Sequence, residues 1–242
     1  MRKRSNHSQA SIMIGPQTIW ILLLGSYDSE TRRILYKVKD EINKLSTYYD
    51  EYLLIPLLLE NVEVYRVVKE DRVGLAILER YAENLWSLMI AIEGKIEVYD
   101  DVGGGSLEEV EEVIEKTYGL RWTRLQLLEK FRYLANVVAG SGLIIVIRHV
   151  ELARCGELIE LTFLLREGVP VDVIRVLVDW EINVSSMLLE LLRMYRIYWE
   201  RYGDEEELLR IIRSKYSISL GKFNRPGSSC KSLKPCTGFS GS

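Results

Sequence analysis

The chain has 242 residues, of which 48% are hydrophobic and 28% are charged, a composition typical of a folded globular protein rather than a disordered one. Its formal net charge of -3 argues against a nucleic-acid-binding protein that depends on a strongly basic surface. Three cysteines and two histidines fit neither a secreted disulfide framework nor a histidine-rich metal centre, so we predict no metal site and no cofactor.

The N-terminal segment is polar or mixed, and residues 1–17 are predicted to form a flexible arm. The basic start is followed by an apolar run, Ile19 to Leu24, which is too short to cross a bilayer and has no small-residue cleavage site after it. We therefore expect a cytoplasmic protein without a membrane partner. The scarcity of Asn and Gln beside abundant Glu, Arg, Ile and Leu indicates a thermophilic origin; a melting transition at mesophilic temperature would contradict this prediction.

The first half of the chain predicts alternating strands and helices. The continuous apolar run that ends at Gly25 is typical of a strand buried on both faces. Asp28 or Ser29 can cap a following helix, whose buried stripe is predicted to be Ile34, Leu35, Val38, Ile42 and Leu45. Strands are predicted at 53–59, 62–68 and 88–92, with a helix at 72–84.

The second half repeats the alternation. Three glycines at 103–105 form a flexible connector, and Ser106 with Glu109 has the spacing of a capping box that opens a helix to about Tyr118. A helix at 123–139, a strand at 143–147, a helix at 150–166 and a last strand at 173–178 follow. Buried strands separated by helices predict an α/β fold with an open, mainly parallel, doubly wound sheet of the flavodoxin or Rossmann-like kind, spanning residues 18–182.

The C-terminal third is predicted to be a helical extension packed on this domain. Met, Leu, Tyr and Trp residues repeat at helical spacing over 187–202, and Asp204 can cap a second helix to about Tyr216, so residues 183–218 are predicted to form a helical pair. Residues 219–242 are rich in Gly, Ser, Lys and Pro and are predicted to be a disordered tail. An exposed part of the stripe would make a homodimer surface through helices 184–216.

Open parallel sheets bind ligands at the carboxyl ends of their strands, near the point where strand order reverses. Four predicted loops lie at such ends. They are Gly25-Ser26-Tyr27-Asp28, Glu93-Gly94, Arg148-His149-Val150-Glu151 and Asp179-Trp180-Glu181. We predict that the substrate contacts come from Gly25, Ser26, Tyr27, Glu93, Gly94, Arg148 and Glu151, with Gly156 beside them.

One segment carries a family pattern. Gly156, Glu160 and Leu161 are followed by Gly168, Pro170 and Val171. In this spacing the segment resembles the nucleoside 2-deoxyribosyltransferase family, whose general layout is shared by the Toll/interleukin-receptor-like NAD hydrolases. The similarity covers about residues 143–178. The chain departs from the family at Thr162, where a small residue is usual, and at Arg154-Cys155, where an acidic residue is often found.

The resemblance implies that the chain binds a nucleoside or nucleotide and transfers or hydrolyses its N-glycosidic bond. It places Glu160 on the family's catalytic glutamate, which attacks or stabilises the anomeric carbon. A carboxylate suits this chemistry because an oxocarbenium-like transition state needs a nearby negative charge. Glu157, one helical turn earlier, would tune Glu160, and His149 would act as a general acid or contact the leaving group.

Other interpretations of the same residues stay open. Glu160 could be a solvated or ion-paired carboxylate, and His149 could be held by backbone groups. Arg148 suits a phosphate contact or a structural salt bridge. The departures at Thr162 and Arg154-Cys155 favour a non-catalytic nucleotide-sensing module of the same fold. The helical pair alternatively indicates a protein-interaction module.

Overall fold

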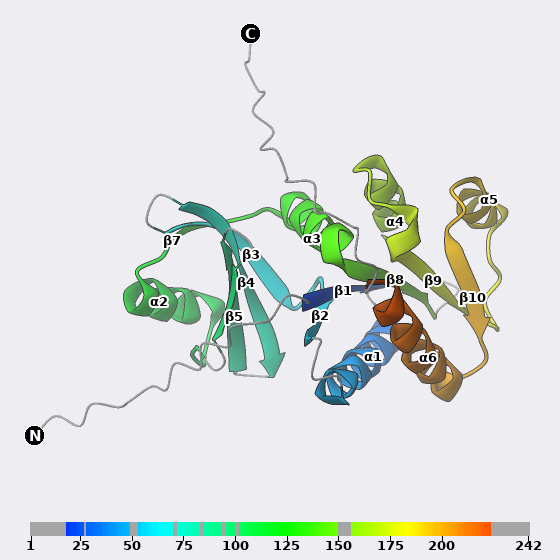
Figure 1. Ribbon diagram of the computed structural model, residues 1–242, viewed down its shortest axis with the longest axis horizontal. Helices are drawn as coiled ribbons and strands as arrows, with labels where there is room; N and C mark the ends of the chain where they lie inside the picture. Colours follow the sequence, from blue (N-terminus) through cyan, green and yellow to red (C-terminus); the bar gives the residue numbers. More distant parts are fainter. Residues whose placement is uncertain are drawn as a thin grey trace, which may run out of the picture.

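The computed structural model describes residues 18–26, 28–48, 53–69, 72–82, 85–92, 95–99, 102–149 and 156–223. Its elements, in chain order, are β1 (Thr18–Gly25), α1 (Ser29–Tyr48), β2 (Leu53–Leu58), β3 (Val62–Lys69), β4 (Arg72–Ala82), β5 (Leu85–Ile92), β6 (Lys95–Tyr99), α2 (Leu107–Tyr118), β7 (Arg121–Arg124), α3 (Leu127–Ser141), β8 (Gly142–Arg148), α4 (Gly156–Arg166), the 3-10 turn η1 (Val171–Val173), β9 (Ile174–Asp179), α5 (Ser186–Met194), β10 (Tyr198–Tyr202) and α6 (Glu205–Phe223). The strands within these ranges form two sheets (Figure 1).

The first sheet is parallel, with the strand order β10-β9-β8-β1-β2. Numbered among themselves from the β2 edge, these strands follow the order 2-1-3-4-5 of flavodoxin-like, doubly wound sheets, and the order reverses between β1 and β8. The central strand β1 is the apolar run of the sequence, and Ile19 to Leu24 are all buried. The predicted parallel α/β sheet is therefore confirmed.

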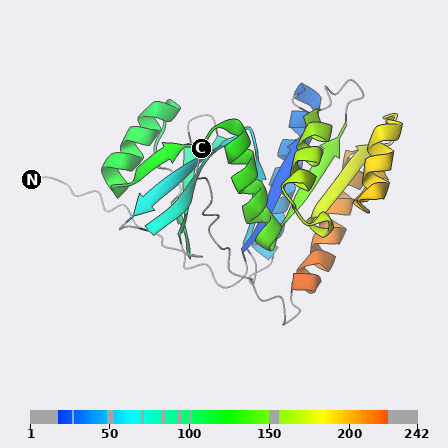
Figure 2. The ribbon, with the colours of Figure 1, turned by 90° about the horizontal axis from the view of Figure 1, so that it is seen from above.

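Helices cover both faces of the parallel sheet, with α1 and α6 on one face and α3, α4 and α5 on the other (Figures 1 and 2). The alternation of β1 explains why both layers exist. Ile21 and Leu23 pack towards α1 and α6, whereas Leu22 and Leu24 pack in the core that contains residues of α3, α4 and α5. The predicted inner stripe of α1 lies in the core on the α1 and α6 side, with Leu45 at its partly buried end.

The second sheet is antiparallel and was not predicted. Its order is β6-β5-β4-β3-β7, and α2, which begins at the predicted Ser106–Glu109 capping box, covers one face. The segment 72–84, predicted as a helix, is strand β4 over Arg72–Ala82, so that prediction was wrong. Pairing with both β3 and β5 decides the conformation, because alternate residues such as Ala76 and Leu78 bury one face against α2.

The two sheets are joined by a common core and by a buried ion pair. One apolar cluster contains Trp20 of β1 together with Val64, Ile77 and Met89 of the antiparallel sheet. Nearby, the Lys39 ammonium of α1 contacts the Glu79 carboxylate of β4, and both side chains are about nine-tenths buried. Burial raises the pKa of Glu79, although the charge of Lys39 partly offsets it.

The C-terminal region contains two helices, but a strand lies between them. Helix α5 ends at Met194. Two residues later Arg196 adopts a left-handed conformation with φ of 55°, and the Ile197 N–H then donates to Leu192 C=O at 2.9 Å. The predicted helical stripe over 187–202 is therefore wrong beyond Met194. Strand β10 follows and extends the parallel sheet beside β9. Helix α6, capped by Asp204 as predicted, continues to Phe223.

The predicted homodimer surface falls partly on α5, whose inner side chains Leu188 and Leu192 are buried while Met187 and Met194 are 65% and 70% exposed. The homodimer stays a prediction. We expect wild-type protein to sediment as a dimer and a Met187→Glu/Met194→Glu variant to sediment as a folded monomer, since two charges on each copy would have to be desolvated at the contact. Wild-type protein that stays monomeric at every concentration would contradict it.

No α-helix in the described part of the chain combines the length and the apolar character needed to cross a bilayer.

Candidate functional site

A small pocket lies at the carboxyl ends of β1 and β2, beside the point where strand order reverses. Its lining includes Gly25 and Ser26 after β1, Leu59 and Glu60 after β2, and Glu160 from α4. The structure thus brings the predicted first-strand loop and the predicted catalytic glutamate to one place. Among the described residues the cavity measures about 20 Å³, which is room for about one water molecule.

Gly25 allows the backbone and side chains around the end of β1 to pack closely. A Cβ atom at position 25 would lie 2.9 Å from the backbone oxygen of Ile147 and 3.0 Å from Thr31 Cγ2. Both neighbours are closer than ordinary van der Waals contact, and the first is backbone that cannot rotate away. The absence of a side chain therefore lets β1, β8 and the first turn of α1 approach one another beside the pocket.

Glu160 lies at the margin of the buried face of α4, because it comes one residue before Leu161 and one helical turn before Leu164. Leu161 and Leu164 are buried in the core under the helix, whereas Glu160 is partly buried with its Oε2 atom shielded from solvent. Thr162, where the chain departs from the family pattern, lies on the exposed side and its hydroxyl donates to Leu158 C=O at 2.7 Å. This departure is thus accommodated by the backbone of the helix itself.

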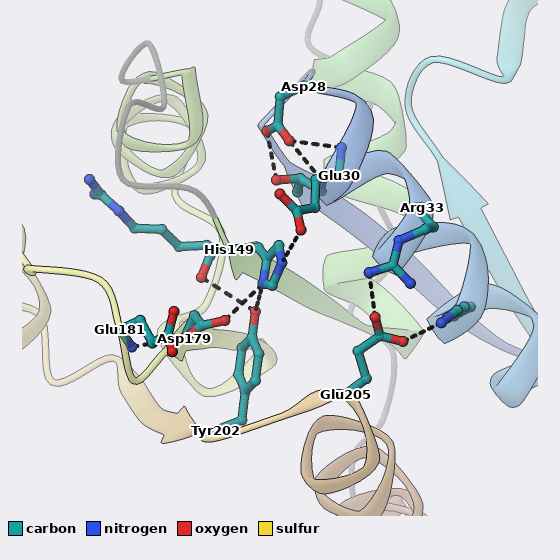
Figure 3. A network of polar contacts seen from close by, with 11 residues as sticks. Asp28, Glu30, Arg33, His149, Asp179, Glu181, Tyr202 and Glu205 are labelled. Carbon is teal, nitrogen blue, oxygen red and sulfur yellow. Dashed lines mark hydrogen bonds and ion pairs between the residues drawn. The ribbon is translucent and has the colours of Figure 1, made fainter.

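A second group of polar side chains lies at the ends of β8, β9 and β10 around His149 (Figure 3). His149 Nδ1 lies 2.9 Å from Asp179 Oδ2 and 3.2 Å from the Tyr202 hydroxyl. On the other side of the ring, His149 Nε2 lies 3.7 Å from a carboxylate oxygen of Glu30, in the first turn of α1. Asp179 and Tyr202 are buried, and Glu30 is exposed.

Burial and neighbouring charge keep the Tyr202 phenol neutral. Burial is the main reason that the pKa of Tyr202 is raised, and the negative charges of Asp179 and Glu205 raise it further. Glu205 is itself held as a carboxylate, because hydrogen bonds from Arg33 and Lys37 of α1 lower its pKa. Glu205 therefore joins the start of α6 to α1 close to Tyr202 (Figure 3).

Asp28 caps helix α1 between the two groups. Its Oδ1 accepts hydrogen bonds from the N–H groups of Thr31 at 2.8 Å and Glu30 at 3.0 Å, and its Oδ2 accepts from the Thr31 hydroxyl at 2.6 Å. Burial works against the charge of Asp28, but the hydrogen bonds from Thr31, Ser26 and Glu30 outweigh it and hold the pKa of Asp28 below its ordinary value.

We predict that Asp28→Ala lowers the free energy of unfolding by about 1–2 kcal/mol at neutral pH, because the cap is lost and the buried Thr31 hydroxyl loses its acceptor. Asp28→Asn, the matched control, keeps a cap but not the charge. Since the pKa of Asp28 is lowered by folding, its charge stabilises the protein above the ordinary aspartate range, and this part is lost as pH falls through the folded-state pKa. Denaturant titrations at several pH values should show wild type converging on Asp28→Asn in acid; a constant difference would contradict the assignment.

The structure places the other predicted residues as follows. Arg148 and His149 stand at the carboxyl end of β8, and Gly156 begins α4. Tyr27, Glu93, Gly94, Glu151 and the side chain of Glu157 lie outside the described residues. Strand β5, which precedes Glu93 and Gly94, belongs to the antiparallel sheet, so the rule for parallel strands does not extend to that loop.

Three residues of the His149 group were not predicted to be part of the site. Asp179 lies in a loop that the sequence analysis had placed at the end of a parallel strand. Its position as the last residue of that buried strand is the feature that could have indicated a role in the site. Tyr202 was placed on a helix, and Glu30 was not singled out. In the described ranges, no cluster of three or more His, Cys, Asp or Glu side chains has a geometry that could hold a metal ion.

No protein-family model matches this chain, and no curated protein matches it.

Proposed function

We propose that the protein cleaves the N-glycosidic bond of a nucleoside or nucleotide at the carboxyl edge of its parallel sheet. The observation that carries this proposal is the position of Glu160, whose side chain lines one pocket with Gly25 and Ser26 at the end of β1, beside the point where strand order reverses. The motif spacing and this position both support a role for Glu160, and each comes from a different property of the chain.

Glu160 suits the reaction chemically. As the C1–N bond breaks, its electron pair leaves with the base and positive charge develops on the sugar, so a carboxylate at C1 either stabilises that charge or forms a covalent glycosyl intermediate. Water or an acceptor base then attacks C1.

In this reaction His149 would donate a proton to the departing base. The departing base takes up a proton, and an imidazole at the end of β8, the strand next to β1, is suited to supply it. Glu160 and His149 would then divide the work, one acting at the sugar and the other at the base.

A non-catalytic nucleotide-sensing module is the second candidate. The small volume of the cavity favours it, because a complete nucleoside does not fit among the described residues in this conformation. A sensing module would be stabilised against thermal unfolding by its ligand, and the ligand would be recovered unchanged after long incubation.

The test is an incubation of wild-type protein with nucleosides, deoxynucleosides, nucleoside monophosphates and NAD, together with an isotopically labelled free base. Chromatography separates free base from new nucleoside. Unlabelled base without labelled nucleoside identifies a hydrolase, and labelled nucleoside identifies a transferase. Ligands that raise the melting temperature but return intact support the sensing module instead.

A further inference from the structure

We infer that Asp179 is a positioning residue that fixes the tautomer and orientation of His149, so that Nε2 is the nitrogen that exchanges protons at the carboxyl edge of the sheet. The use of this nitrogen in base release rests on the proposed function. The Asp179–His149 arrangement itself does not, because it follows from contacts within the chain.

The hydrogen-bond partners assign the proton on the ring. Asp179 Oδ2 lies 2.9 Å from His149 Nδ1, and an ionised carboxylate can only accept. An unprotonated Nδ1 would therefore face another acceptor at this distance. The Tyr202 hydroxyl, 3.2 Å from the same nitrogen, has Arg148 C=O as a further acceptor at 3.5 Å. Nδ1 thus carries the proton, and in the neutral ring Nε2 carries the lone pair.

Asp179 is itself held in place. Its second oxygen, Oδ1, accepts a hydrogen bond from the Glu181 N–H at 2.9 Å, and its side chain is only about one-tenth exposed. The His149 ring also lies nearly parallel to the Tyr202 ring, with an angle of 11° and a centroid distance of 6.3 Å. Because the Asp179 carboxylate is fixed and the buried Tyr202 ring lies beside the imidazole, the side chain of His149 has little rotational freedom.

The Nε2 side of the ring faces helix α1. Nε2 points towards the first turn of α1, where the Glu30 carboxylate lies 3.7 Å away, beyond ordinary hydrogen-bond distance, with a side chain that is 61% exposed (Figure 3). Ile147 pairs with Gly25 of the pocket, and His149 follows two residues later, about 7 Å further along the strand direction. Within the described ranges, the charged and titratable groups that contact the ring are Asp179 on β9, Tyr202 on β10 and Glu30 on α1, with Glu205 of α6 acting on Tyr202.

In the proposed reaction, protonated His149 would donate the Nε2 proton to the base nitrogen as the C1–N bond breaks. The neutral imidazole would then accept a proton from the water that attacks C1, which restores the starting state. Asp179 stabilises the imidazolium that is present before the first transfer and again after the second, without taking its proton. No further reactant is needed, since water supplies both the oxygen and the returning proton.

Asp179→Asn is the decisive variant. The Glu181 N–H should hold the amide oxygen at the Oδ1 position, which turns the amide NH₂ towards His149 Nδ1. Two donors cannot face each other, so the ring is expected to move its proton to Nε2. Tyr202→Phe is the matched control, because it removes a neighbour of Nδ1 but keeps the Asp179 carboxylate.

Long-range proton–nitrogen NMR correlations report the tautomer directly, and His7 is the only other histidine in the chain. Above the pH at which the ring is neutral, we expect a protonated Nδ1 in wild type and in Tyr202→Phe, and a protonated Nε2 in Asp179→Asn. A wild-type ring protonated on Nε2, or an Asp179→Asn spectrum identical to that of wild type, overturns the inference.

Activity separates this inference from the proposed function. If base release is found, Asp179→Asn should lower kcat by about 10²-fold or more and alter its pH profile, with little change in KM. Unchanged kcat in Asp179→Asn overturns the inference. If no substrate of the panel reacts but the tautomer switches as expected, the proposed function fails and the positioning role of Asp179 is supported.

Discussion

Glu160→Gln is expected to lower the rate of base release by about 10³-fold or more. The substitution keeps the size of the side chain but removes both the negative charge and the nucleophilic oxygen. Because Glu160 lies at the pocket while Leu161 and Leu164 hold α4 on the core, the free energy of unfolding should change by no more than about 1 kcal/mol. Steady-state kinetics with chromatographic detection of free base measure the first effect, and denaturant titration measures the second.

Two matched substitutions make this result specific. Glu108→Gln changes an exposed glutamate in the first turn of α2, which covers the antiparallel sheet, and should leave kcat unchanged. Glu167→Gln removes a carboxylate just after α4 whose partner is Arg132 at 2.8 Å, and should affect stability only slightly. A Glu160→Gln protein that is as active as these two controls would exclude Glu160 as the catalytic group.

Lys39→Met is expected to destabilise the protein by about 3–5 kcal/mol at neutral pH, since it leaves the buried Glu79 carboxylate without its counter-charge. The contact joins α1 of the parallel sheet to β4 of the antiparallel sheet, so the variant should weaken the junction between them. Denaturant unfolding followed by tryptophan fluorescence measures the loss. A loss below about 1 kcal/mol would show that water reaches Glu79 and that the pair contributes little.

The pH dependence of this variant has a definite sign. Burial already raises the pKa of Glu79, and Lys39 is the group that opposes the rise. Without Lys39 the neutral carboxyl is favoured more strongly, so the contribution of Glu79 is most favourable in acid and is lost as pH rises through the folded-state pKa. The destabilisation of Lys39→Met should therefore be smaller in acid than at neutral pH. The double variant Lys39→Met/Glu79→Leu, which removes both charges, should recover most of the lost stability at neutral pH.

The parallel half of the fold could be predicted because the pattern of apolar residues in its strands and helices matches the faces that they bury. Strands β1 and β8 are continuous apolar runs, and both are buried on two faces between helical layers. The period of the apolar residues in α1 matches the face that packs on the sheet. The capping residues Asp28, Ser106 and Asp204 have short polar side chains that bond the first turns of their helices, so these boundaries are fixed locally.

The antiparallel sheet and the C-terminal strand could not be predicted, because pairing with neighbouring strands, and not the spacing of their own apolar residues, decides them. In β4, Leu75 and Leu78 have a spacing that also fits a helix, but hydrogen bonds to β3 on one side and β5 on the other hold the segment extended. In β10, Tyr198 and Trp199 continue the helical spacing of α5, yet Arg196 turns the chain and pairing with β9 follows. Strand β4 pairs with the strands immediately before and after it, whereas β10 is separated in sequence from its partner β9 by helix α5.

In the candidate site, too, local features could be predicted and contacts between distant segments could not. Gly25, Ser26 and Glu160 could be found from strand ends and from a motif, because a strand terminus and a helix face are local features. The partners of His149 could not be found in this way. Asp179 and Tyr202 reach it only because β9 lies beside β8 in the sheet and β10 lies beside β9, and strand order is a property of the whole fold.

The central claim is that Glu160 at the carboxyl edge of the parallel sheet breaks an N-glycosidic bond. Its most direct test is the release of free base from the nucleoside, nucleotide and NAD panel by wild-type protein and by folded Glu160→Gln protein under identical conditions. Our account predicts free base from at least one class of substrate with wild type and at least about 10³-fold less with the variant. Equal release by both proteins, or no release by folded wild-type protein from any member of the panel, would contradict it.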